Sequence, residues 1–159
     1  MKAMVVYDSQ YGNTAKVAQT IGQALEGSAE VTVVKVGTVD PEQLRGLDLL
    51  VVGSPTQKFS PTGATKDFLK SIPRGALDGV RIAAFDTRFT PEEIEKVGIL
   101  AFFVRLFGYA AEPMASRLQK KGGNLVAPPQ WFYVAGTEGP LLEGELERAA
   151  EWATEIAAA

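Results

Sequence analysis

MVVYDSQYGNTAKVAQTIGQAL, residues 4–25, joins an apolar run to an amphipathic segment through a short polar turn. The run at residues 3–7 shows little alternation, which is typical of a strand buried on both faces. Beyond the turn, apolar residues recur at spacings of three and four up to Leu25, which predicts one apolar helix face. The stretch therefore predicts a buried strand that leads directly into a helix.

The turn itself, Ser9–Thr14, carries two aliphatic hydroxyls, two amide side chains and one glycine. The first N–H groups of a helix have no internal partner and carry partial positive charge. Gly12 would let a ligand approach the backbone, so the turn predicts a phosphate cradle without lysine or arginine. The alternative is a turn with no ligand, in which Asn13 is the N-cap and Gly12 permits a tight bend.

The composition limits the chemistry that the side chains can perform. The chain has 159 residues, 46% of them hydrophobic and 22% charged, which suits one soluble domain over residues 1–159. It contains no cysteine and no histidine, which excludes disulfides, thiol catalysis and histidine metal sites. Redox or group-transfer chemistry would therefore require a bound cofactor.

Charge and hydropathy give weaker indications. The net charge of −3 is too small to indicate a charged partner, and we expect no nucleic-acid partner. No basic leader precedes the first strand, so we expect a cytoplasmic protein. The most apolar segment, residues 98–107, is interrupted by Arg105 and is too short to span a bilayer.

Strand and helix signals alternate along the rest of the chain. We expect strands at residues 30–36, 48–53 and 80–85, and helices at 65–72, from Thr90 to Lys121 with a break near Gly108, and from Leu142 to Ile156. A fifth strand is expected at 124–126, at 131–134, or at both, because Pro128 and Pro129 interrupt the region. This alternation predicts an α/β fold with a parallel sheet and helices on both faces.

Three polar loops follow the ends of predicted strands, at residues 9–14, 55–60 and 86–89. In parallel sheets, ligands bind beyond the carboxyl ends of the strands, where the winding reverses. A small molecule that touches all three loops is the natural inference.

Taken together, these loops resemble those of the flavodoxin-like family of FMN-binding proteins over nearly the whole chain. The turn at 9–14 is similar to the family's phosphate loop, with Tyr11 where a threonine is usual, and residues 53–56 and 86–88 are similar to its two flavin-flanking loops. The segment from Gly136 to Leu146 resembles the end of many short bacterial members. The resemblance implies a five-stranded parallel sheet of order 2-1-3-4-5 in a three-layer sandwich, with FMN as cofactor.

The resemblance also assigns the candidate site residues. Those that would hold the FMN phosphate are Ser9, Gln10, Tyr11, Gly12, Asn13 and Thr14. Those that would flank the flavin ring are Pro55, Thr56, Gln57, Lys58 and Phe59 from one loop, and Asp86, Thr87, Arg88 and Phe89 from the other.

The ring loops depart from the family pattern. Flavodoxins commonly carry a tryptophan after the threonine of the second loop and a tyrosine in the third, whereas this chain has Gln57-Lys58-Phe59 and Arg88-Phe89. Phe59 or Phe89 stacks on the flavin, or both are core residues. The loop at 57–59 has no glycine to adopt positive φ, and Lys58 and Arg88 add cations. We hypothesise that the protein is not tuned as a low-potential one-electron carrier.

The function implied by the resemblance is an FMN-binding redox protein that transfers electrons between partner proteins or to a small acceptor. No catalytic side chain and no metal site is expected. The alternatives are an FMN-dependent NAD(P)H:quinone-type oxidoreductase and a flavodoxin-like interaction module without cofactor. A phosphoacceptor domain is disfavoured because Gly53-Ser54-Pro55 stands where it would need an aspartate.

Residues 98–111, GILAFFVRLFGYAA, are unusually apolar for a surface helix. We expect this segment to pack across the sheet. Two alternatives are a homodimer contact and a lid near the flavin.

Overall fold

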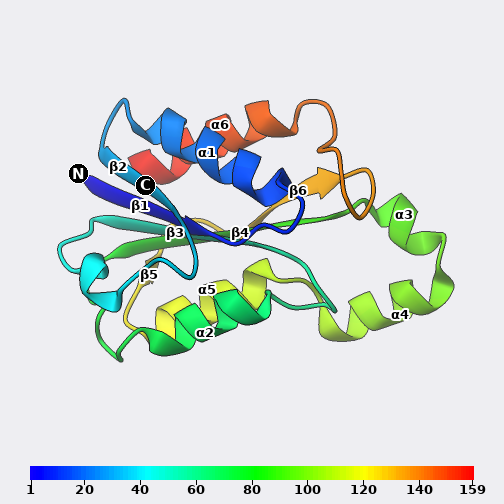
Figure 1. Cartoon of the computed structure of the whole chain (residues 1–159), viewed down its shortest axis with the longest axis horizontal. Coiled ribbons are helices and arrows are strands. Elements are labelled where there is room, and N and C mark those ends of the chain that lie inside the picture. The colour runs from blue at the N-terminus through cyan, green and yellow to red at the C-terminus, as the bar shows by residue number, and fades with distance from the viewer.

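The chain folds into a parallel sheet covered by helices on both faces, and a computed structural model describes all of its residues, 1–159 (Figure 1). The strands are β1 (Lys2–Tyr7), β2 (Glu30–Lys35), β3 (Leu49–Pro55), β4 (Arg81–Phe89), β5 (Asn124–Leu125) and β6 (Gln130–Val134). Their order is β2-β1-β3-β4-β5, and β6 also pairs with β4. The predicted fold class and strand order are confirmed.

The sequence explains the position of each strand. The apolar runs of β1 and β3 are buried along almost their whole length and pair in register, with Val6 opposite Val52. The more polar β2 lies at the edge. Both candidates for the fifth position are strands: β5 pairs with the start of β4, and β6 pairs with its end. Pro128 and Pro129 lie between them, since proline cannot donate to a strand ladder.

Two layers of helices bury the sheet. Helices α1 (Asn13–Leu25) and α6 (Glu145–Ala158) cover one face, and α2 (Gly63–Ser71) and α5 (Ala111–Lys120) cover the other (Figure 1). A short 3-10 helix, η1 (Pro41–Leu44), follows β2. Under α1 and α6, Phe85, Phe132 and Trp152 pack edge to face with ring centroids 5.9–6.3 Å apart. The site therefore stands on a rigid, well-packed support.

The helix starts differ from the expectation at one position. Thr62 caps α2 and Thr90 caps α3 (Pro91–Glu95) through their side chains, as hydroxyl residues commonly do. The N-cap of α1 is Gly12 at φ 94°, and Asn13 is the first helical residue. The alternative interpretation of the turn, in which Asn13 caps α1, is therefore wrong on this point, and the turn needs a glycine because its backbone is left-handed there.

Most of the apolar segment at 98–111 does not pack across the sheet; only Ala110 and Ala111, at its end, are buried in the core. It forms α4 (Gly98–Phe107), which has no buried residue and extends with α3 beyond the end of the sandwich (Figure 1). We call residues 91–107 the α3–α4 arm. The expectation of packing across the sheet is wrong because the chain leaves the sheet at the end of β4 and returns to it only at α5.

The 23-residue segment Gly98–Lys120 is long enough to cross a membrane, and an 18-residue window within it is apolar enough, with a mean hydropathy of 1.2. The segment is, however, broken at Gly108, where φ is 75°, into α4 and α5. Helix α5 buries Ala111, Met114 and Leu118 in the core under the sheet. The structure therefore has no clear membrane span.

Candidate functional site

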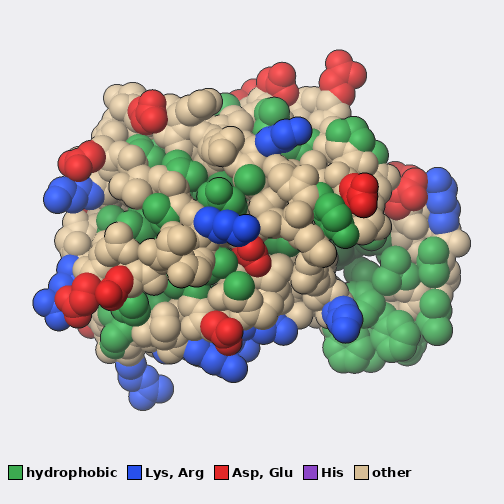
Figure 2. Space-filling model, in the orientation of Figure 1, with side chains coloured by type: hydrophobic (Ala, Val, Ile, Leu, Met, Phe, Trp, Pro, Cys, Tyr) green, Lys and Arg blue, Asp and Glu red, His purple; other side chains and the backbone are tan.

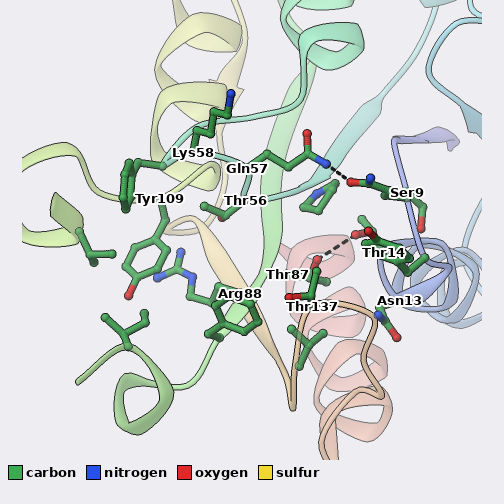
Figure 3. A pocket seen from close by; sticks show the side chains of 18 of the residues that line it. Ser9, Asn13, Thr14, Thr56, Gln57, Lys58, Thr87, Arg88, Tyr109 and Thr137 are labelled. Carbon is green, nitrogen blue, oxygen red and sulfur yellow. Dashed lines mark hydrogen bonds between the residues drawn. The ribbon is translucent and has the colours of Figure 1, made fainter. Parts of the chain in front are cut away.

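A cavity of about 420 Å³ lies at the carboxyl ends of β1, β3 and β4, with the α3–α4 arm forming its outer wall (Figure 3). Thirteen of the fifteen residues predicted for the site line this cavity. These are Ser9, Gln10, Tyr11, Asn13, Thr14, Pro55, Thr56, Gln57, Lys58, Phe59, Thr87, Arg88 and Phe89. The remaining two do not line it: Asp86 is fully buried behind the lining, and Gly12 is a half-buried residue of the first turn. The three loops therefore meet at one place, as the strand ends of a parallel sheet should.

The turn between β1 and α1 presents a cluster of free backbone donors. The N–H groups without an acceptor in the protein are those of Gln10, Tyr11, Asn13, Thr14 and Ala15. The N–H of Gly12 donates to the Ser9 Oγ at 3.1 Å, which leaves the Ser9 hydroxyl proton available. A group of unpaired N–H donors at a helix start is a site for a phosphate or carboxylate.

Side chains of this turn fasten it to the neighbouring loops. The Thr14 and Thr87 hydroxyls are hydrogen-bonded at 2.9 Å, and both residues are buried (Figure 3). The Asn13 Nδ2 donates to the carbonyl oxygen of Glu138 at 3.1 Å. A Cβ on Gly139 would meet the Asn13 side chain at 2.6 Å, so only glycine fits that close approach. Thr14 and Asn13 therefore orient the turn, in addition to lining the cavity.

The second loop is a tight turn between Gln57 and Ser60, closed by two backbone hydrogen bonds of 2.8 and 3.0 Å. Its two central residues, Lys58 and Phe59, have φ values of 47° and 66°. The loop thus adopts the left-handed geometry without a glycine, at a cost of roughly 1–2 kcal/mol for each residue. Gln57 also donates to the Gln10 side chain, which ties this loop to the first one (Figure 3).

Phe59 contacts the α3–α4 arm. Its ring lies 5.9 Å from that of Phe103 and 6.0 Å from that of Phe107, centroid to centroid. The second aromatic candidate, Phe89, also lines the cavity. Phe59 is thus not a core residue: it lines the cavity and also packs against two aromatic rings of α4.

Arg88 does not offer a free cation to the cavity. Its guanidinium forms two hydrogen bonds of 2.6 and 2.7 Å with the fully buried Asp86 carboxylate. The ring of Tyr109 lies 3.6 Å from the guanidinium carbon and that of Trp131 lies 4.8 Å from it. Of the two cations invoked for the redox hypothesis, only Lys58 is exposed and without a carboxylate partner.

Asp86 also anchors the start of α5, because the Ala111 N–H donates to its Oδ2 at 2.9 Å. Burial raises the pKa of the Asp86 carboxyl, and the hydrogen bonds from Arg88 and Ala111 partly offset that rise. Since Asp86 is behind the lining, its role is to position Arg88 and α5.

Sequence reasoning missed six lining residues: Ile94, Leu100, Val104, Tyr109, Val134 and Thr137. The first three belong to the α3–α4 arm, whose placement depends on long-range packing. Burial raises the pKa of the Tyr109 phenol above its ordinary value. Thr137 lies within the Gly136–Leu146 stretch whose similarity to short bacterial members was a usable signal.

The cavity suits an elongated molecule that is anionic at one end and flat and apolar at the other. The free N–H groups lie at the β1–α1 turn, and apolar side chains of Phe59, Phe89, Ile94 and Leu100 contribute walls elsewhere in the cavity. FMN has this combination of a phosphate and a planar ring system, and the residues present therefore fit it.

Comparisons with known proteins agree with this geometry. The family described as Flavodoxin matches residues 5–152. A flavodoxin of Picosynechococcus is 42% identical over 55 residues, which are 35% of this chain and 32% of that protein. The matched stretch thus spans about a third of that relative's length.

Two solved structures are similar over almost the whole chain. Oxidised flavodoxin 1 of Bacillus cereus superposes with a TM-score of 0.76 at 18% identity, covering 99% of this chain and 98% of that one. A flavodoxin from the domain Archaea gives 0.73 at 23% identity, with 99% and 97% covered. At these identities, the likeness shows the fold.

Proposed function

The chain belongs to the flavodoxin family, whose members bind FMN, and on this premise we propose that it transfers electrons from a donor to a partner protein or to a small acceptor. The observation that carries the proposal is the group of unpaired N–H donors at the β1–α1 turn, which opens into the same cavity as the two ring loops. FMN would supply the redox chemistry, since the chain has no cysteine or histidine.

In this proposal the fifteen predicted residues divide by position. The phosphate would be held by the free backbone N–H groups of the β1–α1 turn, those of residues 10, 11 and 13–15, and by the Ser9 hydroxyl. Thr14 and Asn13 would act by orienting the turn, through Thr87 and Glu138. The loops at 55–59 and 86–89 would flank the ring and exclude water from it, with Asp86 positioning Arg88.

Charge near the ring would come mainly from Lys58. The Arg88 guanidinium is compensated by Asp86 and covered by Tyr109, so its influence on the reduction potential is weakened. The hypothesis that this protein is not a low-potential one-electron carrier therefore rests on Lys58 and on the turn at 57–60. Two cross-turn hydrogen bonds and the contacts of Phe59 with α4 oppose rearrangement of that turn.

The test is a titration of the purified protein with FMN, followed by flavin fluorescence, and then a redox assay of the loaded protein. We expect quenching at a single site. Reduction by a donor protein but not by NAD(P)H supports a carrier. Absence of FMN binding would contradict the proposal and favour an interaction module.

A second candidate, an NAD(P)H:quinone-type oxidoreductase, is favoured by one observation. The α3–α4 arm adds Ile94, Leu100 and Val104 to the wall of the cavity, which gives it apolar surface suited to a flat, apolar acceptor. Steady oxidation of NAD(P)H by the FMN-loaded protein, dependent on an added quinone, would select this candidate over the carrier.

A further inference from the structure

Six of the ten exposed large apolar side chains of the molecule lie between Val97 and Phe107. Five of them form what we call the α4 patch: Ile99, Phe102, Phe103, Leu106 and Phe107, which are 36% to 68% exposed. Figure 2 shows apolar side chains gathered at the end of the molecule that Figure 1 assigns to the arm. Elsewhere on this face, apolar and charged side chains are mixed.

Helix α4 is apolar on its other side as well. Leu100 and Val104 line the cavity, and Arg105 is the one charged residue among the ten of the helix. A helix that is apolar all round normally has apolar surroundings all round. The sheet does not provide them, because no residue of α4 is buried.

The length of α4 limits the form that a lipid contact could take. Ten residues extend about 15 Å, half of the roughly 30 Å hydrocarbon core of a bilayer. The 23-residue apolar segment that includes α4 cannot be extended through α5, because Met114 and Leu118 belong to the core. Only α4 is therefore available to lipid, and it is long enough to enter the interface of a bilayer but not to span it.

A second copy of the chain covers the patch less well. With aromatic side chains of about 150–250 Å² each, the exposed area of the patch is on the order of 500 Å². Two projecting helices bury only one side of each other, so a dimer would bury less than the roughly 1,000 Å² total that a specific interface needs. A fluid lipid surface can surround a convex helix, whereas a second convex helix cannot.

We propose that α4 docks the protein on a lipid bilayer by inserting the α4 patch into the interface. Arg105 would extend to the headgroups. Next to α4, Lys96 is paired with Glu93 at 2.8 Å, and the protein has a net charge of −3. Apolar burial thus drives the docking, so it should depend little on salt or on anionic lipid. Given the proposed redox function, docking would favour a lipid-soluble acceptor.

The test is co-sedimentation of the FMN-loaded full chain with phosphatidylcholine vesicles, with and without phosphatidylglycerol. Wild type should sediment with both. The double variant F102S/L106S should lower the ratio of bound to free protein at least about a hundredfold, because each side chain contributes about tenfold or more. Leu146→Ser on α6, which alters a side chain that is 37% exposed, is the matched control and should bind as wild type does.

Three results would overturn the proposal: wild type stays in solution, F102S/L106S binds as well as wild type, or L146S lowers binding equally. Light scattering, which measures the molecular mass in solution, tests the alternative that a second copy of the chain covers the α4 patch. A dimer that F102S/L106S converts to a monomer, with no vesicle binding, assigns the patch to a second copy. Phe102 and Leu106 lie outside the cavity lining, so FMN titration of the variants reports separately on the redox proposal.

Discussion

The β1–α1 turn and the α3–α4 arm border the same cavity but are built in opposite ways. The turn is six residues long, is fastened by Thr14 and Asn13 to neighbouring loops, and presents backbone donors. The arm is seventeen residues long and has one buried residue, Ile94. The β1–α1 turn is thus held in place by its own hydrogen bonds to neighbouring loops. The α3–α4 arm, in contrast, contributes almost nothing to the core.

This difference implies a division of labour. Elements fastened by buried polar contacts lose stability when one contact is removed, because the remaining partner stays buried and unpaired. Elements with exposed apolar side chains tolerate substitution with little change in stability, and their exposed side chains mark sites of interaction with partners. We therefore expect changes at the loops to alter the free energy of unfolding, and changes in the α4 patch, outside the cavity lining, to alter only association.

The largest expected effect is at the ion pair of Arg88 and Asp86, which lies near the end of β4, just before the α3–α4 arm. Arg88→Met leaves the carboxylate buried without its cation and should lower the free energy of unfolding by about 3–5 kcal/mol at neutral pH. The measurement is urea denaturation. Arg45→Met, which removes the cation of an exposed pair with Glu42, should change little.

The same variant carries a pH signature. The folded-state pKa of Asp86 is already raised above its unfolded value of 3.8, and loss of Arg88 raises it further. The stability associated with the protonated carboxyl is present below the unfolded pKa and is lost as pH rises through the folded pKa. The loss of unfolding free energy in R88M, relative to wild type, should thus be larger at pH 8 than at pH 5. In D86N/R88M, which has no carboxyl at this position, the loss should not increase between pH 5 and pH 8. An equal deficit at both pH values would contradict the assignment.

An intermediate effect is expected at the turn. Thr14→Val keeps the shape of the side chain but leaves the Thr87 hydroxyl buried without a partner, which should cost about 1–3 kcal/mol. The double variant T14V/T87V should recover part of that loss. Thr154→Val, on the exposed side of α6, is the matched control. Additive losses in the double variant would show that the two hydroxyls do not interact.

The smallest effect is expected on the arm. Ile99→Ala should change the free energy of unfolding by less than about 0.5 kcal/mol, because the side chain is 68% exposed. Ile21→Ala in α1 removes the same atoms from a fully buried position and should cost about 2–5 kcal/mol. Thermal or chemical denaturation of the pair measures the contrast. A large loss for I99A would mean that the arm is part of the cooperative core.

The same division explains what could be predicted from sequence. The parallel α/β sheet and its three loops follow from hydrophobic patterns, and the strand order follows from the family resemblance. Proline positions leave one or two segments open for the fifth strand, and both are formed. The arm was misplaced, because apolar residues at helical spacing indicate a buried face without saying what buries it. Tyr109 and the pairing of Arg88 with Asp86 were missed since they depend on how α5 returns to the sheet. The left-handed Lys58 and Phe59 contradict local preference, which no sequence pattern reveals.

The central claim is that backbone N–H groups at the β1–α1 turn bind the phosphate of FMN. The most direct measurement compares the dissociation constants of FMN and riboflavin for the same protein, by fluorescence quenching in one buffer. Two hydrogen bonds to a charged group are worth about 3–6 kcal/mol, so FMN should bind at least about a hundredfold more tightly. Equal affinity for the two flavins would contradict the claim.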